Sequence, residues 1–145
     1  MPRAVRLALE ALVASFRPLL TAAGVTEQQW RVLRALQEGP ASQVELARTC
    51  VMHEASLTGV LSRMEHEGLI ERRRARVDRR RVLVAASSRG AALVDQLAPA
   101  IRQRYEGLAA TVGHDTLADL TGAAEAFSRR LSPAATPVKT LRAAS

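Results

Sequence analysis

The sequence predicts a mainly α-helical chain with one small β-hairpin, in the order α-α-α-α-β-β-α-α. Six segments place apolar residues at helical spacing and are bounded by capping or stop residues. Between the fourth and fifth of these segments, the pattern changes to short β-prone runs on either side of an arginine-rich stretch. The chain has 145 residues, 48% of them hydrophobic, which is enough to bury the core of one domain.

The first two predicted helices are separated by Gly24. The first covers residues 3–23, and Pro18 inside it predicts a kink because proline removes one backbone hydrogen bond. Its apolar stripe consists of Leu7, Leu12, Phe16, Leu19 and Leu20. In the second helix, Thr26 and Gln29 have the spacing of a capping box, and Gly39-Pro40 ends the helix. Its predicted buried face consists of Trp30, Leu33 and Leu36.

The third and fourth predicted helices are short and follow closely on one another. Ser42 and Glu45 repeat the capping-box spacing ahead of the third helix. That helix contains Val44, Leu46 and Ala47. The fourth helix spans residues 54–67 and ends at Gly68. Its apolar residues have the spacing i, i+3, i+4, i+7, which predicts a buried stripe. The stripe consists of Leu57, Val60, Leu61 and Met64.

The apolar runs Leu69-Ile70 and Val82–Val84 predict the two strands of the hairpin. Residues 72–81 (RRRARVDRRR) contain seven arginines and one aspartate, a net charge of +6. The whole chain has a net charge of +7, and its other 135 residues hold 14 basic and 13 acidic side chains. The positive charge is therefore concentrated in one segment, which points to a partner that carries phosphate groups.

Two long helices follow, at about residues 88–112 and 115–131, the first capped by Ser87 or Ser88 and bent at Pro99. Their predicted apolar faces consist of Leu93, Leu97, Ile101 and Leu108, and of Leu117, Leu120, Ala124, Phe127 and Leu131. One chain offers nothing obvious to cover the outer helices, which predicts a homodimer in which the terminal helices of two subunits interleave. The expected domains are dimerisation helices at 1–24 and 88–131, a winged helix-turn-helix lobe at 25–87 and a flexible tail at 132–145.

Several classes of protein are disfavoured. No apolar run approaches the ~20 residues of a membrane span, and the N-terminus lacks a signal-peptide cleavage pattern, so we expect a cytoplasmic protein without a membrane partner. One cysteine permits no internal disulfide, and three scattered histidines do not suggest a metal site. No catalytic or phosphate-cradling motif is visible, so we expect no enzyme activity and no cofactor.

The central elements have the order of a winged helix-turn-helix, in which the second of two short helices enters the major groove of DNA. Residues 54–67 leave short polar side chains and an arginine opposite the buried stripe, as groove contacts require. A narrow minor groove attracts arginine side chains because its negative potential is concentrated. The arginine-rich tip of the hairpin is therefore suited to bind there. The expected DNA-contacting residues are Ser56, Thr58, Ser62, Arg63, Arg76, Asp78, Arg79 and Arg80. The alternative is that they are ordinary solvent-exposed polar residues and a solvated run of charge.

The stretch from about residue 5 to 131 resembles the MarR family of bacterial transcriptional regulators, and within it the homoprotocatechuate degradative operon repressors. The resemblance is carried by SFRPLL at 15–20, TEQQWRVLRAL at 26–36, SLTGVLSRMEHEGLIERR at 56–73 and DRRRVLVAASSRG at 78–90. It implies a homodimeric repressor on a pseudo-palindromic operator, and it matches Asp78 and Arg80 to the family's wing aspartate and minor-groove arginine. This chain departs from the family in having Ala75 and Val77 where an Asp and an Arg are common.

The resemblance also implies a pocket for a small aromatic carboxylate where the first two helices meet the winged-helix lobe. The expected ligand-binding residues are Ser15, Phe16, Arg17, Trp30, Arg31, Met52 and His53. An aromatic acid needs an apolar wall and a cation, so we expect Arg17 to bind the carboxylate and His53 a ring substituent. Alternatively, Trp30 is a plain core residue, Arg17 forms a dimer-interface ion pair and His53 caps the fourth helix. The implied effectors are hydroxyphenylacetates, with benzoates, cinnamates or pyridine carboxylates as alternatives.

Two other functions stay open at this point. A redox-responsive repressor would sense oxidants through Cys50, which requires an exposed thiol of lowered pKa. The surroundings of Cys50 in the sequence are instead typical of a buried small hydrophobic residue. A nonspecific architectural protein would use the arginine segment without reading bases, and it would bind any duplex with similar affinity.

Overall fold

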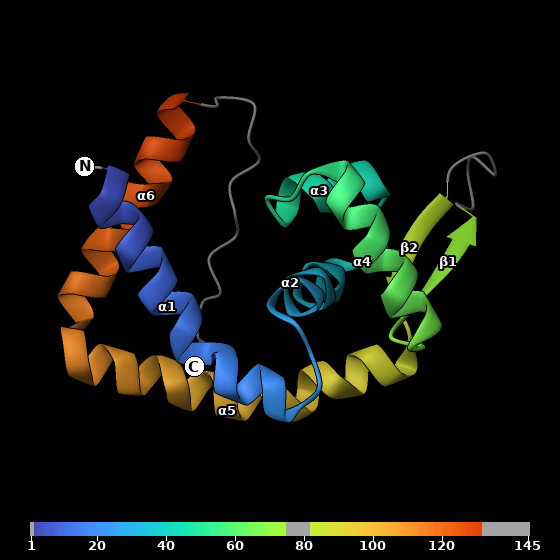
Figure 1. The fold of residues 1–145 in the computed structure, drawn as a ribbon, viewed down its shortest axis with the longest axis horizontal. Coiled ribbons are helices and arrows are strands. Elements are labelled where there is room, and N and C mark those ends of the chain that lie inside the picture. The colour runs from blue at the N-terminus through green and yellow to red at the C-terminus, as the bar shows by residue number, and fades with distance from the viewer. Residues whose placement is uncertain (1, 75–81, 132–145) are drawn as a thin grey trace. The chain divides into compact units, whose positions relative to one another are not determined.

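The computed structural model describes residues 2–74 and 82–131 (Figure 1). Within them it contains α1 (Pro2–Ala22), α2 (Glu27–Ala35), the 3-10 turn η1 (Leu36–Glu38), α3 (Gln43–Thr49), α4 (Glu54–His66), β1 (Ile70–Arg74), β2 (Val82–Ala86), α5 (Ser88–Val112) and α6 (His114–Leu131). This order confirms the six helices and the hairpin predicted from the sequence. The chain divides into two compact units, with the boundary between Pro99 and Ala100 inside α5.

The predicted capping residues begin three of these helices. The Thr26 hydroxyl accepts a hydrogen bond from the Gln29 N–H at 3.2 Å, and the Gln29 side chain accepts one from the Thr26 N–H at 2.9 Å. Ser42 and Glu45 form the same reciprocal pair at the start of α3. At α5, the Ser87 hydroxyl accepts from the N–H of Gly90 at 3.0 Å. These bonds satisfy N–H groups that have no partner within a helix, and they set where α2, α3 and α5 begin.

The core of the first unit joins α2, α3 and α4 to the hairpin and the start of α5. The side chains of Leu33, Leu57, Leu61 and Met64 have no exposed surface. A fully buried aliphatic side chain contributes about 1.5–3 kcal/mol relative to an exposed one. The other buried members of this cluster are Val32, Leu36, Leu46, Ala47, Cys50, Val60, Leu69, Ile70, Val84 and Val94. All four apolar residues predicted for α4 are buried, so one face of that helix is firmly anchored.

The hairpin is antiparallel, with Arg72 opposite Val84 in its middle. Val84 also exchanges two backbone hydrogen bonds with Ala41, at 3.0 and 2.8 Å, so the segment before α3 is bonded to β2. The burial pattern of β1 runs from a buried Ile70 to exposed arginines at its far end. The hairpin is therefore rooted in the core and leaves it at the end where its positive charge is concentrated.

Several predicted apolar faces are uncovered in the single chain. Leu120, Phe127 and Leu131 of α6 are 49%, 63% and 68% exposed, and Leu7 of α1 is 53% exposed. The prediction that α6 buries its stripe is therefore wrong for one chain, since no residue of α6 is buried; α6 is the last helix labelled in Figure 1. Helical spacing specifies which face is apolar, whereas burial also needs a second surface, which spacing does not provide.

Among the described residues, no single helix is long and apolar enough to cross a membrane. Residues 3–22 and 27–38 reach that length and composition only when they are counted together, and they meet at a bend of 88°.

Candidate nucleic-acid interface and ligand pocket

The outward face of α4 carries the expected major-groove residues. Ser56, Thr58, Ser62 and Arg63 are all exposed, opposite the buried stripe that anchors the helix. Between them lies Gly59, whose missing side chain leaves open space on the helix surface. This face consists of small side chains with one arginine near its C-terminal end. Side chains of this size and chemistry suit the major groove.

Thr58 has a second role within the protein. Its hydroxyl accepts a hydrogen bond from the Gln43 side chain of α3 at 2.7 Å and donates one to the Glu54 carbonyl at 2.9 Å. Gln43 and Thr58 thereby join the first turn of α3 to α4. This exposed contact adds to the core that the two helices share in holding them together.

The arginines of β1 lie beside the C-terminal end of α4. The Arg72 Nε donates to the Glu65 carboxylate at 3.0 Å, so the strand is tied to the helix by an ion pair. Arg73 pairs with Glu71 on the same strand, and Arg74 is exposed. The expected wing-tip residues, which are Arg76, Asp78, Arg79 and Arg80, lie outside the described residues.

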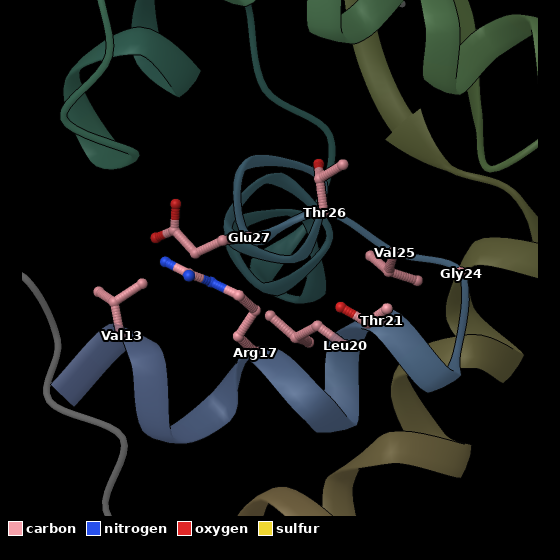
Figure 2. A pocket seen from close by; sticks show the side chains of 8 residues that line it. All are labelled: Val13, Arg17, Leu20, Thr21, Gly24, Val25, Thr26 and Glu27. Carbon is pink, nitrogen blue, oxygen red and sulfur yellow. The ribbon is translucent and has the colours of Figure 1, made fainter. Parts of the chain in front are cut away.

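A cavity of about 490 Å³ lies between α1 and the start of α2. This pocket is lined by Val13, Arg17, Leu20, Thr21, Gly24, Val25, Thr26 and Glu27. Figure 2 shows the Arg17 guanidinium pointing from α1 toward the carboxylate of Glu27, with Val13 and Leu20 on the same side of the pocket as Arg17. The pocket thus offers an apolar wall, a cation and a carboxylate, in a volume that suits a small organic acid.

Of the seven expected ligand-binding residues, only Arg17 lines this pocket. The Ser15 hydroxyl donates to the Leu12 carbonyl of its own helix at 2.6 Å, and His53 is exposed at the N-cap of α4 without a side-chain capping bond. Trp30 and Met52 pack against the core, and Arg34 lies 5.9 Å from the centre of the Trp30 ring. Phe16 is half-buried on α1, outside the lining.

Glu27, which the sequence did not predict as a pocket residue, connects this pocket to the helix-turn-helix through Arg31. The Glu27 carboxylate contacts Arg31 twice, at 2.6 Å to Nε and 2.7 Å to Nη2. The Arg31 Nη1 donates to the carbonyl of Cys50 at 2.8 Å. The i, i+4 spacing of Glu27 and Arg31 predicts the pair, but nothing in the sequence indicates the bond to Cys50.

A second connection runs from α2 to the end of α4. Gln29 is buried, with 5% of its surface exposed, and its side chain donates to Glu67 at 2.7 Å while it also caps α2. Glu67 is the C-cap of α4. A buried amide must be hydrogen-bonded to be tolerated, so this bond holds the start of α2 against the end of α4.

The thiol of Cys50 is 2% exposed and lies at the C-cap of α3. Burial raises the pKa of the Cys50 thiol above its usual value, and the nearby Arg31 guanidinium offsets this only in part. A buried thiol of raised pKa is a poor nucleophile, so these surroundings do not favour redox sensing. Within residues 2–74 and 82–131, no group of three or more His, Cys, Asp or Glu side chains could hold a metal ion.

Comparisons with known proteins agree with this arrangement. The model of the MarR family matches residues 23–81. The chain is 36% identical to the HTH-type transcriptional regulator FarR of Neisseria gonorrhoeae, over 76% of each chain. It is 35% identical to the homoprotocatechuate degradative operon repressor of Escherichia coli, over 83% of this chain and 82% of that protein. The crystal structure of NadR in complex with 4-hydroxyphenylacetate superposes with a TM-score of 0.80 at 28% identity, covering 91% of this chain and 97% of that one.

Proposed function

Because the chain belongs to the MarR family of transcriptional regulators, we propose that it is a dimeric repressor whose α4 and wing bind a pseudo-palindromic operator, and that a small aromatic carboxylate releases it. The observation that carries this proposal is the outward face of α4, which is small, polar and arginine-bearing on a helix anchored by a fully buried stripe. Regulators of this family are not enzymes.

The DNA-binding part of the proposal divides the contacts between two elements. Ser56, Ser62 and Arg63 on α4 face the major groove, where Arg63 suits a bidentate contact to guanine. The arginine-rich wing, with Asp78 and Arg80 at its tip, contacts phosphates and the minor groove. Arg72 of β1 is paired with Glu65 of α4, so the strand that leads into the arginine-rich segment lies beside the helix that carries Ser62 and Arg63.

The effector part of the proposal rests on the pocket between α1 and α2. Its apolar wall accepts an aromatic ring, and the Arg17 guanidinium binds the carboxylate. A hydroxyphenylacetate is the first compound to test, because 4-hydroxyphenylacetate is the ligand in the similar NadR structure. Benzoates and pyridine carboxylates carry the same combination of ring and carboxylate.

Affinity for the promoter region of the protein's own gene, compared with random duplex at one salt concentration, tests the DNA-binding part. We expect the promoter fragment to bind at least ~10³-fold more tightly, since base contacts add to phosphate contacts. Equal affinity for both duplexes would instead support a nonspecific architectural protein.

A further inference from the structure

The pocket is connected to α4, the proposed recognition helix, through the Glu27 carboxylate, the Arg31 guanidinium and the Cys50 carbonyl. Glu27 lines the pocket, accepts a hydrogen bond from Arg31 Nη2 at 2.7 Å and has a carboxylate oxygen 2.6 Å from Arg31 Nε, within ion-pair distance. The Arg31 Nη1 donates a hydrogen bond to the Cys50 carbonyl at 2.8 Å. One planar guanidinium therefore joins a pocket residue to the main chain of the helix-turn-helix, using a fork geometry that a lysine ammonium does not have.

The bond from Arg31 ends at a strained turn. Cys50 caps α3, and the next residue, Val51, has a φ of +51°. A β-branched residue rarely adopts this left-handed conformation, so neighbouring contacts must hold the turn in place. The turn also includes His53, the N-cap of α4, so its conformation sets where the recognition helix starts.

Glu27 also stands where the carboxylate of an effector would go. Its side chain and that of Arg17 point toward one another across the pocket in Figure 2. A second anion that enters to pair with Arg17 repels the Glu27 carboxylate, and a displaced Glu27 changes its ion pair with Arg31. Any shift of that guanidinium acts directly on the Cys50 carbonyl.

We propose that Glu27 is a resident carboxylate that occupies the effector's charge site, and that an acid competing with it weakens the Arg31 bond to the turn before α4. This inference rests on the proposed function, because it concerns the same pocket and the same operator. It explains how an anion at α1 and α2 changes the recognition helix without touching it, through contacts that differ between two states.

Two variants separate acid binding from its transmission to DNA. Glu27→Gln removes the resident negative charge, so we expect this variant to bind 4-hydroxyphenylacetate about tenfold more tightly than wild type does. Quenching of Trp30 fluorescence measures the binding. Arg31→Lys keeps the charge but loses the fork. We expect the dissociation constant of this variant for the acid to stay within about threefold of the wild-type value. Saturating acid is expected to weaken its operator binding by less than about threefold, whereas the same acid weakens operator binding of the wild type by about tenfold or more.

Glu125→Gln and Arg129→Lys are the matched controls, because these residues form another i, i+4 pair, on α6. Both controls are expected to behave as wild type. Acid binding by Glu27→Gln that is no tighter than wild type, or full release of Arg31→Lys by acid, overturns the inference while the proposed function stands. A wild-type protein that binds its promoter but no aromatic acid overturns the proposed effector together with the inference.

A separate observation concerns Gly59 in the middle of α4. Glycine inside a helix lowers stability relative to alanine, and a Cβ built at Gly59 meets no atom within 4 Å. Neither packing nor a positive φ requires glycine there. Unlike the equally open Gly107 of α5, Gly59 lies on the exposed face of α4 between Ser56 and Ser62, where a glycine lets a partner approach the backbone closely.

We infer that Gly59 marks the point where DNA comes nearest to the axis of α4, so that this residue helps determine operator binding. Gly59→Ala is expected to raise Tm by about 2–5 °C while weakening operator binding about tenfold. Gly107→Ala, on α5 and equally open, is the control and is expected to raise Tm without weakening binding. A Gly59→Ala protein that binds its operator as tightly as wild type overturns this inference. If wild type binds random DNA as tightly as its operator, the proposed function is overturned instead.

Discussion

Gly90 is a residue whose importance only the three-dimensional structure reveals. A Cβ at this position would lie 2.1 Å from the Leu69 carbonyl oxygen and 3.0 Å from a methyl carbon of Leu33. The start of α5 therefore passes so close to the root of the hairpin that no side chain fits. In the sequence, Gly90 looks like an ordinary glycine in the first turn of a helix.

We expect Gly90→Ala to lower the free energy of unfolding by about 1–3 kcal/mol, because the main chain at Leu69, just before β1, cannot yield as a flexible side chain could. Gly107→Ala, in the same helix but in open space, is expected to raise it by about 0.5–1 kcal/mol. Urea denaturation of the two variants measures both effects. A Gly90→Ala protein as stable as wild type would mean that α5 does not pack closely against the main chain at Leu69.

Cys50 gives a second prediction about a single residue. Because burial raises the pKa of its thiol, the neutral form predominates below the usual value of 9.0. The contribution of this neutral thiol to the free energy of unfolding is therefore complete below pH 9.0 and declines as the pH rises further. At about pH 8 we expect the folded protein to react with an alkylating reagent much more slowly than the urea-unfolded protein does.

The same burial predicts that peroxide leaves operator binding unchanged. The comparison protein is Cys50→Ser, treated and assayed identically. Release of wild type by peroxide, abolished in Cys50→Ser, would establish the redox alternative instead.

At the scale of the elements, the two faces of α4 were predictable from the sequence, whereas most of the residues that line the pocket were not. The spacing of Leu57, Val60, Leu61 and Met64 defines a buried face, and the exposed face follows from it by geometry alone. The pocket depends on how α1 packs against α2 across the Gly24 turn, which local patterns do not encode. The need of an acid for a cation predicts Arg17, whereas no local pattern places Glu27 in the pocket, because its position there depends on how α2 starts beside α1.

The wing provides the prediction for this scale. Replacing Arg80 by Ala is expected to weaken operator binding and to reduce the slope of log K against log salt by about 0.9, the value for one phosphate contact. Arg130→Ala on α6 removes the same charge elsewhere and is expected to leave the slope unchanged. Affinities measured at a series of salt concentrations decide this, and an unchanged slope in the Arg80 variant would remove Arg80 from the interface.

At the scale of the whole molecule, the uncovered faces of α1 and α6 support the proposed dimer. Phe127 is 63% exposed and lies on the apolar side of α6 with Leu120 and Leu131. Apolar surface of this kind is stabilised when a second chain covers it. A chain of 15.7 kDa should therefore be found in solution at twice that mass.

Phe127→Glu places a charge in that surface, and we expect it to shift the mass toward that of a single chain and to weaken operator binding. Ser128→Glu adds the same charge at an exposed polar position next to it and is expected to stay dimeric. Light scattering after size-exclusion chromatography measures the masses. A dimeric Phe127→Glu protein would mean that subunits associate through another surface.

The most direct test of the proposed regulation is the affinity of the wild-type dimer for its promoter fragment as 4-hydroxyphenylacetate is added at constant salt. We expect the dissociation constant to rise about tenfold or more as the acid saturates the pocket, and the uncharged amide of the same acid to have no effect, because Arg17 binds the carboxylate. A panel that also contains benzoate and nicotinate extends the test to the other ring types. If no member of the panel changes the dissociation constant, the protein is not a repressor released by an aromatic acid.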